Sequence, residues 1–489
     1  MTKARFDIGG ASLIVSGSGA PPERACLEGA RARIVGEITV GEGTWSVRFR
    51  LLVSRWGGPA LPAPSGAYRM SLTTEGGAEL GADASIGREM FELFHAQLAA
   101  GELLVWPPID PAYESGEGSR ALELRYMGGN TGAHRLENAV FFESFYGRVA
   151  GCNPLAIDRE IARVAPHVTR YWSVVDRSVQ VPDGAIAVVD GSPEWWRARA
   201  EARLLVVNDW LRRPFVRRDG QRVLQTWHGT PLKRLALHRR GFQPRRWAAV
   251  VRESLRWNVL LAQNGYAFRV LRKAYAYLGG RPLLDRQLWV EGYPRNDVLT
   301  TGDGAAVRAR LGIAPDEEVL LYAPTWRDDR EEMVDFVDPE RLAAERGAVV
   351  LVRGHTRTLL PGHDVTAPRV IDVTAYSDTA ELMLAADALI TDYSSVMFDF
   401  SVTGKPMHFL VPDLEHYRGA LRGFYFDLLA RAPGPVVRSY DELLTALDHD
   451  RAEYAERYAT WQAAFNRLDD GHASERVVAR LIDAGMITP

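Results

Sequence analysis

His228 is the residue of this sequence best placed to do chemistry. It follows an apolar run, residues 223–227, that predicts a buried strand ending in Trp227, and Gly229, Thr230 and Pro231 then predict a turn that opens a helix. Backbone N–H groups converge on anions where a strand end precedes a helix, and an imidazole titrates near neutral pH. The segment therefore predicts a general base beside a phosphate, which takes a proton from a hydroxyl nucleophile. A structural histidine that bonds a carbonyl is the alternative.

A second candidate site follows the apolar run of residues 349–352. Arg353, Gly354 and His355 stand directly after this predicted strand. A permanently charged guanidinium beside an imidazole suits the binding of a phosphoryl oxygen and the stabilisation of charge that develops on it. An ordinary surface loop is the alternative.

A third candidate site begins where the predicted strand 388–391 ends. Asp392, Ser394 and Ser395 precede a predicted helix, and Asp399 lies one turn into it. Serine hydroxyls together with free helix N–H groups make a phosphate cradle. Ordinary N-capping by Asp392 or Ser394 needs no ligand and is the alternative. Asp399 is placed either to bond a ligand hydroxyl or to brace the cap.

Two proline-containing turns complete the candidate set. Residues 322–327 include Pro324 and Thr325, and residues 292–297 include Arg295. Proline turns alone explain both segments as well as ligand binding does. The sequence has no P-loop and no cysteine or histidine pattern typical of zinc, and the acidic pair at 328–329 is thin evidence for a metal. We therefore expect neither a metal nor a cofactor.

The elements that must position these residues fall into three parts. Residues 1–125 show short period-two runs between Gly and Pro clusters, which predict a small antiparallel β domain. Residues 126–302 and 303–489 each alternate apolar strands with amphipathic helices, which predicts two consecutive parallel α/β halves with a cleft between them. The helical tail, residues 440–485, is expected to cover the second sheet.

Composition limits the function classes. The chain of 489 residues is 46% hydrophobic and 25% charged, which excludes a largely disordered protein. Its formal charge of −3 makes nucleic acid an unexpected partner. Two cysteines cannot build a disulfide scaffold, and we find neither a signal-peptide core nor a run of 18 apolar residues. We therefore expect a cytoplasmic protein.

Local charge points to an anionic partner. Residues 212–246 carry eleven Lys and Arg against the single acidic residue Asp219. Solvated helix faces usually mix both signs, so this stretch favours anionic lipid headgroups or a polyphosphate chain. A plain solvated face is the alternative.

Taken in order, these motifs resemble the CDP-glycerol glycerophosphotransferase family, the primases and polymerases of teichoic acid and capsule polyol-phosphate polymers. The resemblance spans residues 204–477 and rests on segments 221–233, 292–297, 322–327, 391–399, 405–406 and 422–427. One departure is Thr356, which follows His355 where the family usually has proline. The first 125 residues resemble no family that we can name.

The resemblance implies a GT-B-like fold, two Rossmann-type halves with the nucleotide in the cleft, mostly on the second half. An acceptor hydroxyl attacks the β-phosphorus of CDP-glycerol and CMP leaves. His228 is then the base, with Arg353 and His355 stabilising the phosphoryl charge. The remaining substrate-binding residues are Trp227, Gly229, Thr230, Pro231, Arg295, Pro324, Thr325, Asp392, Ser394, Ser395 and Asp399.

The implied acceptor is a lipid-linked polyol-phosphate chain at the inner face of the cell membrane, where the basic stretch 212–246 would hold the protein peripherally. Three alternatives remain open. The first is that the donor is CDP-ribitol. The second is a nucleotide-sugar glycosyltransferase that makes a surface polymer, and the third is a polymer-binding protein without activity. For residues 1–125 we expect a role in acceptor binding or assembly.

Overall fold

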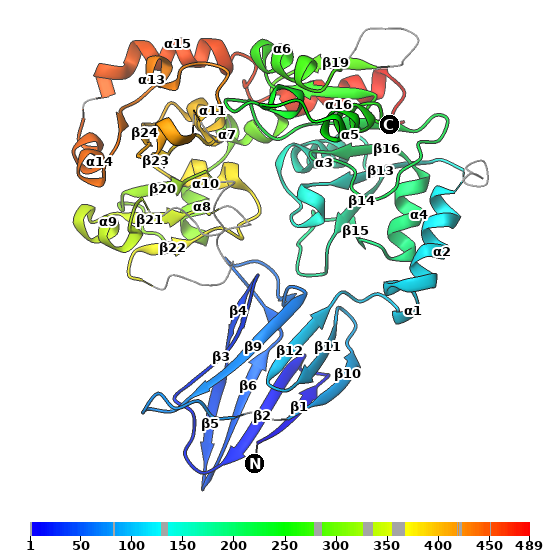
Figure 1. Cartoon of the computed structure of the whole chain (residues 1–489), viewed down its shortest axis with the longest axis vertical. Coiled ribbons are helices and arrows are strands. Elements are labelled where there is room, and N and C mark those ends of the chain that lie inside the picture. Colours follow the sequence, from blue (N-terminus) through cyan, green and yellow to red (C-terminus); the bar gives the residue numbers. More distant parts are fainter. Residues whose placement is uncertain are drawn as a thin grey trace.

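A computed structural model describes residues 2–81, 84–128, 135–277, 286–325, 336–354, 367–417, 419, 423–449 and 451–489. His355, Thr356 and residues 326–335 lie outside the described residues. In Figure 1 a β-rich region (blue) lies below two α/β halves, the first cyan to green and the second yellow to orange.

The β-rich region, residues 2–106, packs two antiparallel sheets face to face. One sheet has the order β1 (Lys3–Asp7), β2 (Ser12–Ser18), β6 (Thr44–Arg50), β5 (Glu37–Gly41). The other has the order β10 (Ile86–Met90), β11 (His95–Ala99), β12 (Glu102–Trp106), β9 (Gly66–Thr73), β3 (Arg24–Gly29), β4 (Arg33–Val35). Along β6 the buried side chains Trp45, Val47 and Phe49 alternate with more exposed ones, which is the pattern of a strand with one face on a core. The antiparallel β prediction is confirmed.

Short elements connect this region to the rest of the chain. The small hairpin of β7 (Leu52–Val53) and β8 (Leu61–Pro62) follows β6 and precedes β9 in the chain. After β12 the chain runs through α1 (Pro111–Glu114) and α2 (Gly116–Met127) into the first half.

The first α/β half is a parallel sheet with a reversal of strand order at its centre. The order is β15 (Ile186–Val189), β14 (Thr169–Val174), β13 (Glu137–Glu143), β16 (Ala202–Val207), β17 (Arg222–Gln225), β18 (Val259–Ala262), β19 (Gln287–Val290). Its helical elements are η2 (Phe145–Gly147), α3 (Cys152–Val164), α4 (Pro193–Glu201), η3 (Ala236–His238), α5 (Pro244–Ser254) and α6 (Gly265–Ala274). The chain leaves β13 in one direction and returns at β16 to continue in the other, so the switch point lies between them.

The second half repeats this plan. Its parallel sheet has the order β22 (Val370–Asp372), β21 (Val349–Val352), β20 (Val319–Ala323), β23 (Ala388–Thr391), β24 (Met407–Leu410), β25 (Val436–Val437), with the switch point between β20 and β23. The helical elements before and around it are η5 (Pro294–Asn296), α7 (Val298–Thr301), α8 (Gly304–Arg310), α9 (Pro339–Arg346), α10 (Thr379–Ala385), α11 (Val396–Phe400), η6 (Ser401–Thr403), α12 (Leu414–His416), α13 (Leu428–Arg431), α14 (Tyr440–Leu447), η8 (Arg451–Tyr454) and α15 (Ala455–Phe465). The parallel α/β prediction is confirmed.

Contrary to the prediction from the sequence, the last helix does not cover the second sheet. In α16 (Ala473–Asp483), the buried residues Val477, Val478 and Leu481 form one apolar stripe, which packs in the core of the first half with Val140 and Leu204. Figure 1 shows this red helix lying over the first half. The C-terminal segment thus crosses back and ties the two halves together. No helix in the described residues combines the length and apolar character needed to span a bilayer.

We predict that Leu481→Ala lowers the free energy of unfolding by about 2–5 kcal/mol, because it removes a fully buried side chain from the core of the first half. Urea denaturation measures this change. Leu124→Ala, at a position 61% exposed, is the control and should shift stability by less than about 0.5 kcal/mol. Equal effects of the two substitutions would contradict the packing of α16 described above.

Candidate active site

The switch points of the two sheets open onto one cleft of about 1710 Å³. Ligands bind outside the carboxyl ends of parallel strands at such points. Residues from both halves and from the β-rich region line the cleft, and the predicted site residues among them are His228, Arg295, Pro324, Arg353, Ser394, Ser395 and Asp399. Residues more than 160 positions apart in the sequence therefore meet at one site.

Hydrogen bonding fixes the orientation of the His228 imidazole. Its Nδ1 lies 2.7 Å from the backbone oxygen of Asn208, at the end of β16. Because a carbonyl oxygen only accepts, Nδ1 carries the proton in the neutral ring, and Nε2 is left with a free lone pair. The ring also stacks on Trp227 at a centroid distance of 4.5 Å. This is the tautomer that a general base acting through Nε2 requires.

A strained turn directs His228 into the cleft. Trp227 has a φ of 55°, a left-handed conformation that is uncommon for a bulky residue. Its N–H donates to Gln225 Oε1 at 2.9 Å, and its oxygen accepts from Asn153 Nδ2 at 3.2 Å. Such strain persists where the surroundings over-determine it and is typical of functional positions.

The prediction of a helix after Pro231 is wrong. The backbone of residues 232–234 pairs instead with the chain near Phe424, through Tyr425 N–H to Leu232 oxygen at 2.9 Å and Arg234 N–H to Gly423 oxygen at 3.0 Å. These groups are therefore unavailable to a helix. Pairing with a segment some 190 residues away has no local sequence signal.

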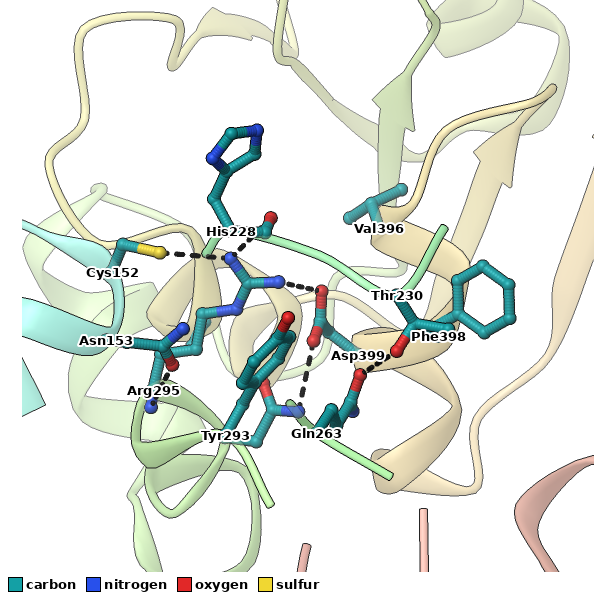
Figure 2. Close-up of polar contacts among 12 residues, drawn as sticks. Cys152, Asn153, His228, Thr230, Gln263, Tyr293, Arg295, Val396, Phe398 and Asp399 are labelled. Carbon is teal, nitrogen blue, oxygen red and sulfur yellow. Dashed lines mark hydrogen bonds and ion pairs between the residues drawn. The ribbon is translucent and has the colours of Figure 1, made fainter. Parts of the chain in front are cut away.

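Arg295 joins the His228 loop to the second half. Its Nη1 donates to the His228 oxygen and to Cys152 Sγ, both at 3.0 Å, and its Nη2 donates to Asp399 Oδ2 at 2.6 Å. Asn296 Nδ2 donates to the other carboxylate oxygen of Asp399 at 3.0 Å. In Figure 2 the His228 imidazole points away from this cluster while its backbone oxygen points toward it. Arg295 and Asp399 thus hold the loop in place.

Burial acts differently on the two partners of this pair, because it raises the pKa of Asp399 while Arg295 stays charged. The side chains of Arg295 and Asp399 are 16% and 4% exposed. Burial opposes the charged guanidinium, but Asp399, Cys152 and Tyr293 together outweigh it and raise the pKa of Arg295. Removing one partner would leave the other buried without compensation.

Three predicted residues of the loop support it from within. A Cβ on Gly229 would lie 2.7 Å from Ser395 Oγ, so a larger residue would displace the Ser395 side chain where the two halves approach each other. Thr230 Oγ1 donates to Gln263 Oε1 at 2.5 Å, and the Pro231 oxygen accepts from Tyr266 OH at 2.8 Å. Neither Thr230 nor Pro231 lines the cleft.

Asp469 accepts hydrogen bonds from several residues of the same network. Its Oδ2 accepts from Gln263 Nε2 at 2.7 Å, and its Oδ1 accepts from Tyr293 N–H at 3.1 Å and Asn296 Nδ2 at 3.2 Å. Burial raises the pKa of Asp469 from an ordinary value of 3.8 to about 6. This carboxyl lies in the segment that leads into α16, so the crossing of the C-terminal chain also supports the site.

The second half presents two hydroxyls and a proline turn to the cleft. Ser394 and Ser395 line it beside Pro324. Thr325 N–H donates to Asp392 Oδ1 at 2.9 Å, and Asp392 is buried, so these two residues fix the loops after β20 and β23 relative to each other. The short distance from Ser395 Oγ to the position of a Cβ on Gly229 places the serine beside the His228 loop.

Arg353 lies in the same cleft, anchored by the chain around it. Its Nη1 donates to the Val373 and Tyr376 oxygens, both at 2.8 Å. Burial lowers its pKa to about 10, which leaves the guanidinium charged at neutral pH. Its predicted companion, His355, lies outside the described residues.

Several residues of the site went unnoticed in the sequence. Asn208 orients His228, Asn153 supports Trp227, and Tyr146 donates to Asp209 Oδ1 at 2.5 Å while Arg212 lies 3.3 Å over its ring. Asn208 and Asp209 follow β16, and Tyr146 follows β13. Assigning β13 and its place beside β16 would have identified them, since both strand ends flank the switch point.

Two parallel α/β sheets whose switch points face one cleft are the architecture of enzymes that bind nucleotide-type ligands between two halves. Residues 132–483 match the CDP-Glycerol:Poly(glycerophosphate) glycerophosphotransferase family, and the chain belongs to this family. The resemblance seen in the sequence is confirmed. The β-rich region precedes the matched residues.

Curated relatives agree with this assignment. The chain is 34% identical over 373 residues to the teichoic acid poly(glycerol phosphate) polymerase of Bacillus subtilis strain 168, covering 71% of this chain but 48% of that protein. It thus spans about half the length of this relative. It is 33% identical over 382 residues to the teichoic acid glycerol-phosphate transferase of Staphylococcus aureus, covering 70% of this chain and 92% of the transferase.

A solved structure shares the fold. A histidine-to-asparagine variant of the wall teichoic acid polymerase TagF, soaked with CDPG, superimposes with a TM-score of 0.66 and 31% identity. The match covers 76% of this chain and 93% of that structure.

We predict that Asp469→Asn changes the pH dependence of stability. The folded state binds the Asp469 proton more tightly than the unfolded state does. The protonated carboxyl therefore adds most to the free energy of unfolding below about pH 4, and this stabilisation is lost as the pH rises through about 6. Between these limits wild type should lose about 3 kcal/mol that the variant keeps. Urea denaturation from pH 4 to 7 measures the difference, and parallel curves would contradict the raised pKa.

Proposed function

We propose that this protein transfers glycerol phosphate from CDP-glycerol to a hydroxyl of a polyol-phosphate acceptor and releases CMP. The observation that carries the proposal is the His228 imidazole, whose Nδ1 is bonded to a carbonyl and which lines a cleft shared with Ser394, Ser395 and Arg353. Membership of the glycerophosphotransferase family supports this choice of reaction.

The proposed step balances as a displacement at phosphorus. The acceptor oxygen attacks the β-phosphorus of CDP-glycerol and forms a new P–O bond, while the bond from that phosphorus to the bridging oxygen breaks. CMP leaves with the bridging oxygen, and His228 Nε2 takes the acceptor proton. Arg353 stabilises the charge on the transferring phosphoryl oxygens. We assign the same role to His355 on the resemblance alone.

For the donor we propose a site on the second half, as in a GT-B-like enzyme. The hydroxyls of Ser394 and Ser395 and the Pro324 turn would hold its phosphates, since they line the cleft on that side. Arg295 and Asp399 bond each other and the His228 loop, so we propose that they position the site. We choose glycerol over ribitol as the polyol because both relatives described above are glycerol-phosphate enzymes.

His228→Ala should lower CMP release by about 10²- to 10⁴-fold, the usual contribution of a general base, while leaving the fold intact. The assay follows CMP from CDP-glycerol and an oligo(glycerol phosphate) acceptor, with circular dichroism as the check on folding. His472→Ala is the matched control, because His472 is 61% exposed at the start of α16 and pairs with Glu475. Near-normal activity of His228→Ala would remove it as the base.

We also propose that one face of the first half lies on an anionic membrane. Within the basic stretch 212–246, Arg218 is buried and Arg213 pairs with Asp190, so these two are left out of the proposed face. The basic-aromatic face consists of exposed residues around η3 and α5: Arg234, Arg239, Arg240, Phe242, Arg245 and Trp247. Phe242 is 80% exposed and Trp247 48% exposed. Arginines beside exposed aromatic rings suit headgroups of the inner leaflet, where a lipid-linked acceptor would be met.

Replacing Arg239, Arg240 and Arg245 with serine should weaken binding to vesicles containing anionic lipid, and the loss should be largest at low salt because exposed charges are screened by ions. Sedimentation with vesicles measures the bound fraction. The control replaces three exposed arginines of the β-rich region, Arg5, Arg24 and Arg69. Equal binding by the two triple variants would favour a plain solvated face.

A further inference from the structure

The loop of residues 54–60 in the β-rich region is strained where it enters the cleft. Trp56 has a φ of 47° and is followed by Gly57 at 70°. A left-handed conformation is unfavourable for a bulky aromatic residue and persists only where its surroundings impose it. Both Arg55 and Trp56 line the cleft that contains His228. The strain thus presents two large side chains to the site.

Contacts with both α/β halves hold the β-rich region at the cleft. The Trp56 ring lies 5.3 Å from the ring of Tyr376, whose backbone oxygen accepts from Arg353. On the other side Arg31 pairs with Asp176, which follows β14 of the first half, and Asp176 Oδ2 also accepts from Ser65 N–H at 2.9 Å. The β-rich region therefore bridges the two halves at the cleft.

The Arg55 guanidinium has no carboxylate partner among the described residues. Other cleft arginines form ion pairs, such as Arg170 with Asp158 and Arg310 with Glu381. The half-buried Arg55 side chain forms no hydrogen bond or ion pair with a residue that the structure describes. A guanidinium kept in a cleft without a carboxylate suits the two oxygens of a phosphodiester.

The cleft has room for more than the donor. Its volume of about 1710 Å³ exceeds the roughly 300–1,000 Å³ of a typical small-molecule site. The proposed donor contacts, Ser394, Ser395 and Pro324, belong to the second half. The β-rich region lies outside the family match of residues 132–483, so chemistry shared with the relatives does not require it.

We propose that Arg55 and Trp56 form a subsite for the acceptor chain, binding a phosphodiester unit behind the reactive hydroxyl. Arg55 contacts the phosphate, and the face of Trp56 packs on the carbon backbone of the adjacent polyol. The proposal rests on the proposed function, and it makes the β-rich region the part of the protein that favours a chain over a single unit.

The test compares KM values of the full-length protein for an oligo(glycerol phosphate) acceptor and for CDP-glycerol. Arg55→Ala should raise the ratio of the acceptor KM to the donor KM about tenfold, the loss expected for one charge-assisted contact. Trp56→Gly, which fits the left-handed backbone, should raise it in the same direction. Arg5→Ala, on the exposed strand β1, should leave the ratio unchanged.

An unchanged ratio in both Arg55→Ala and Trp56→Gly would overturn the subsite while leaving the proposed function standing. If wild type transfers nothing from CDP-glycerol, the proposed function fails, and calorimetric titration with the oligomer alone then decides the subsite. About tenfold weaker binding by Arg55→Ala would support it, and equal binding by wild type and variant would overturn it.

Discussion

The buried ion pair between Arg295 and Asp399 is the constraint on which the rest of the site depends. The arginine comes from η5, at the end of the first half, and the carboxylate from α11 of the second. Through its other nitrogen Arg295 bonds the oxygen of His228, so the position of the base is set by a charge pair that crosses between the halves. Charge-assisted bonds of this kind are short and directional, which suits them to fixing geometry.

Around this pair, several contacts join segments that are far apart in the sequence. Asp469 bonds Gln263 and Asn296 before α16 returns to the first half, and Gly423 and Tyr425 pair with the backbone that follows the His228 loop. The β-rich region adds a third connection through Trp56 and Asp176. Each link joins segments far apart in sequence, so the cleft is a property of the whole chain.

The sequence predicted the motifs better than their roles. Strand ends are visible in apolar runs, and this placed His228, Arg353 and Ser394 at the edge where ligands bind. It could not show that Asp399 would be engaged by Arg295, or that Thr230 would be buried against Gln263, because side-chain partners across halves leave no local pattern. The prediction of a helix after Pro231 was wrong because the backbone there pairs with a distant segment, which also leaves no local pattern. The apolar stripe of α16 does not reveal in the sequence which of the two halves it packs against.

The most direct test of the proposed reaction follows the oxygen that bridges the two phosphorus atoms of the donor. CDP-glycerol labelled with ¹⁸O at that position would be incubated with the protein and an oligo(glycerol phosphate) acceptor, and the products examined by ³¹P nuclear magnetic resonance. Attack at the β-phosphorus, with His228 as base, predicts that acceptor-dependent turnover leaves the label in CMP. Label retained on the glycerol phosphate would show attack at the α-phosphorus and contradict the account.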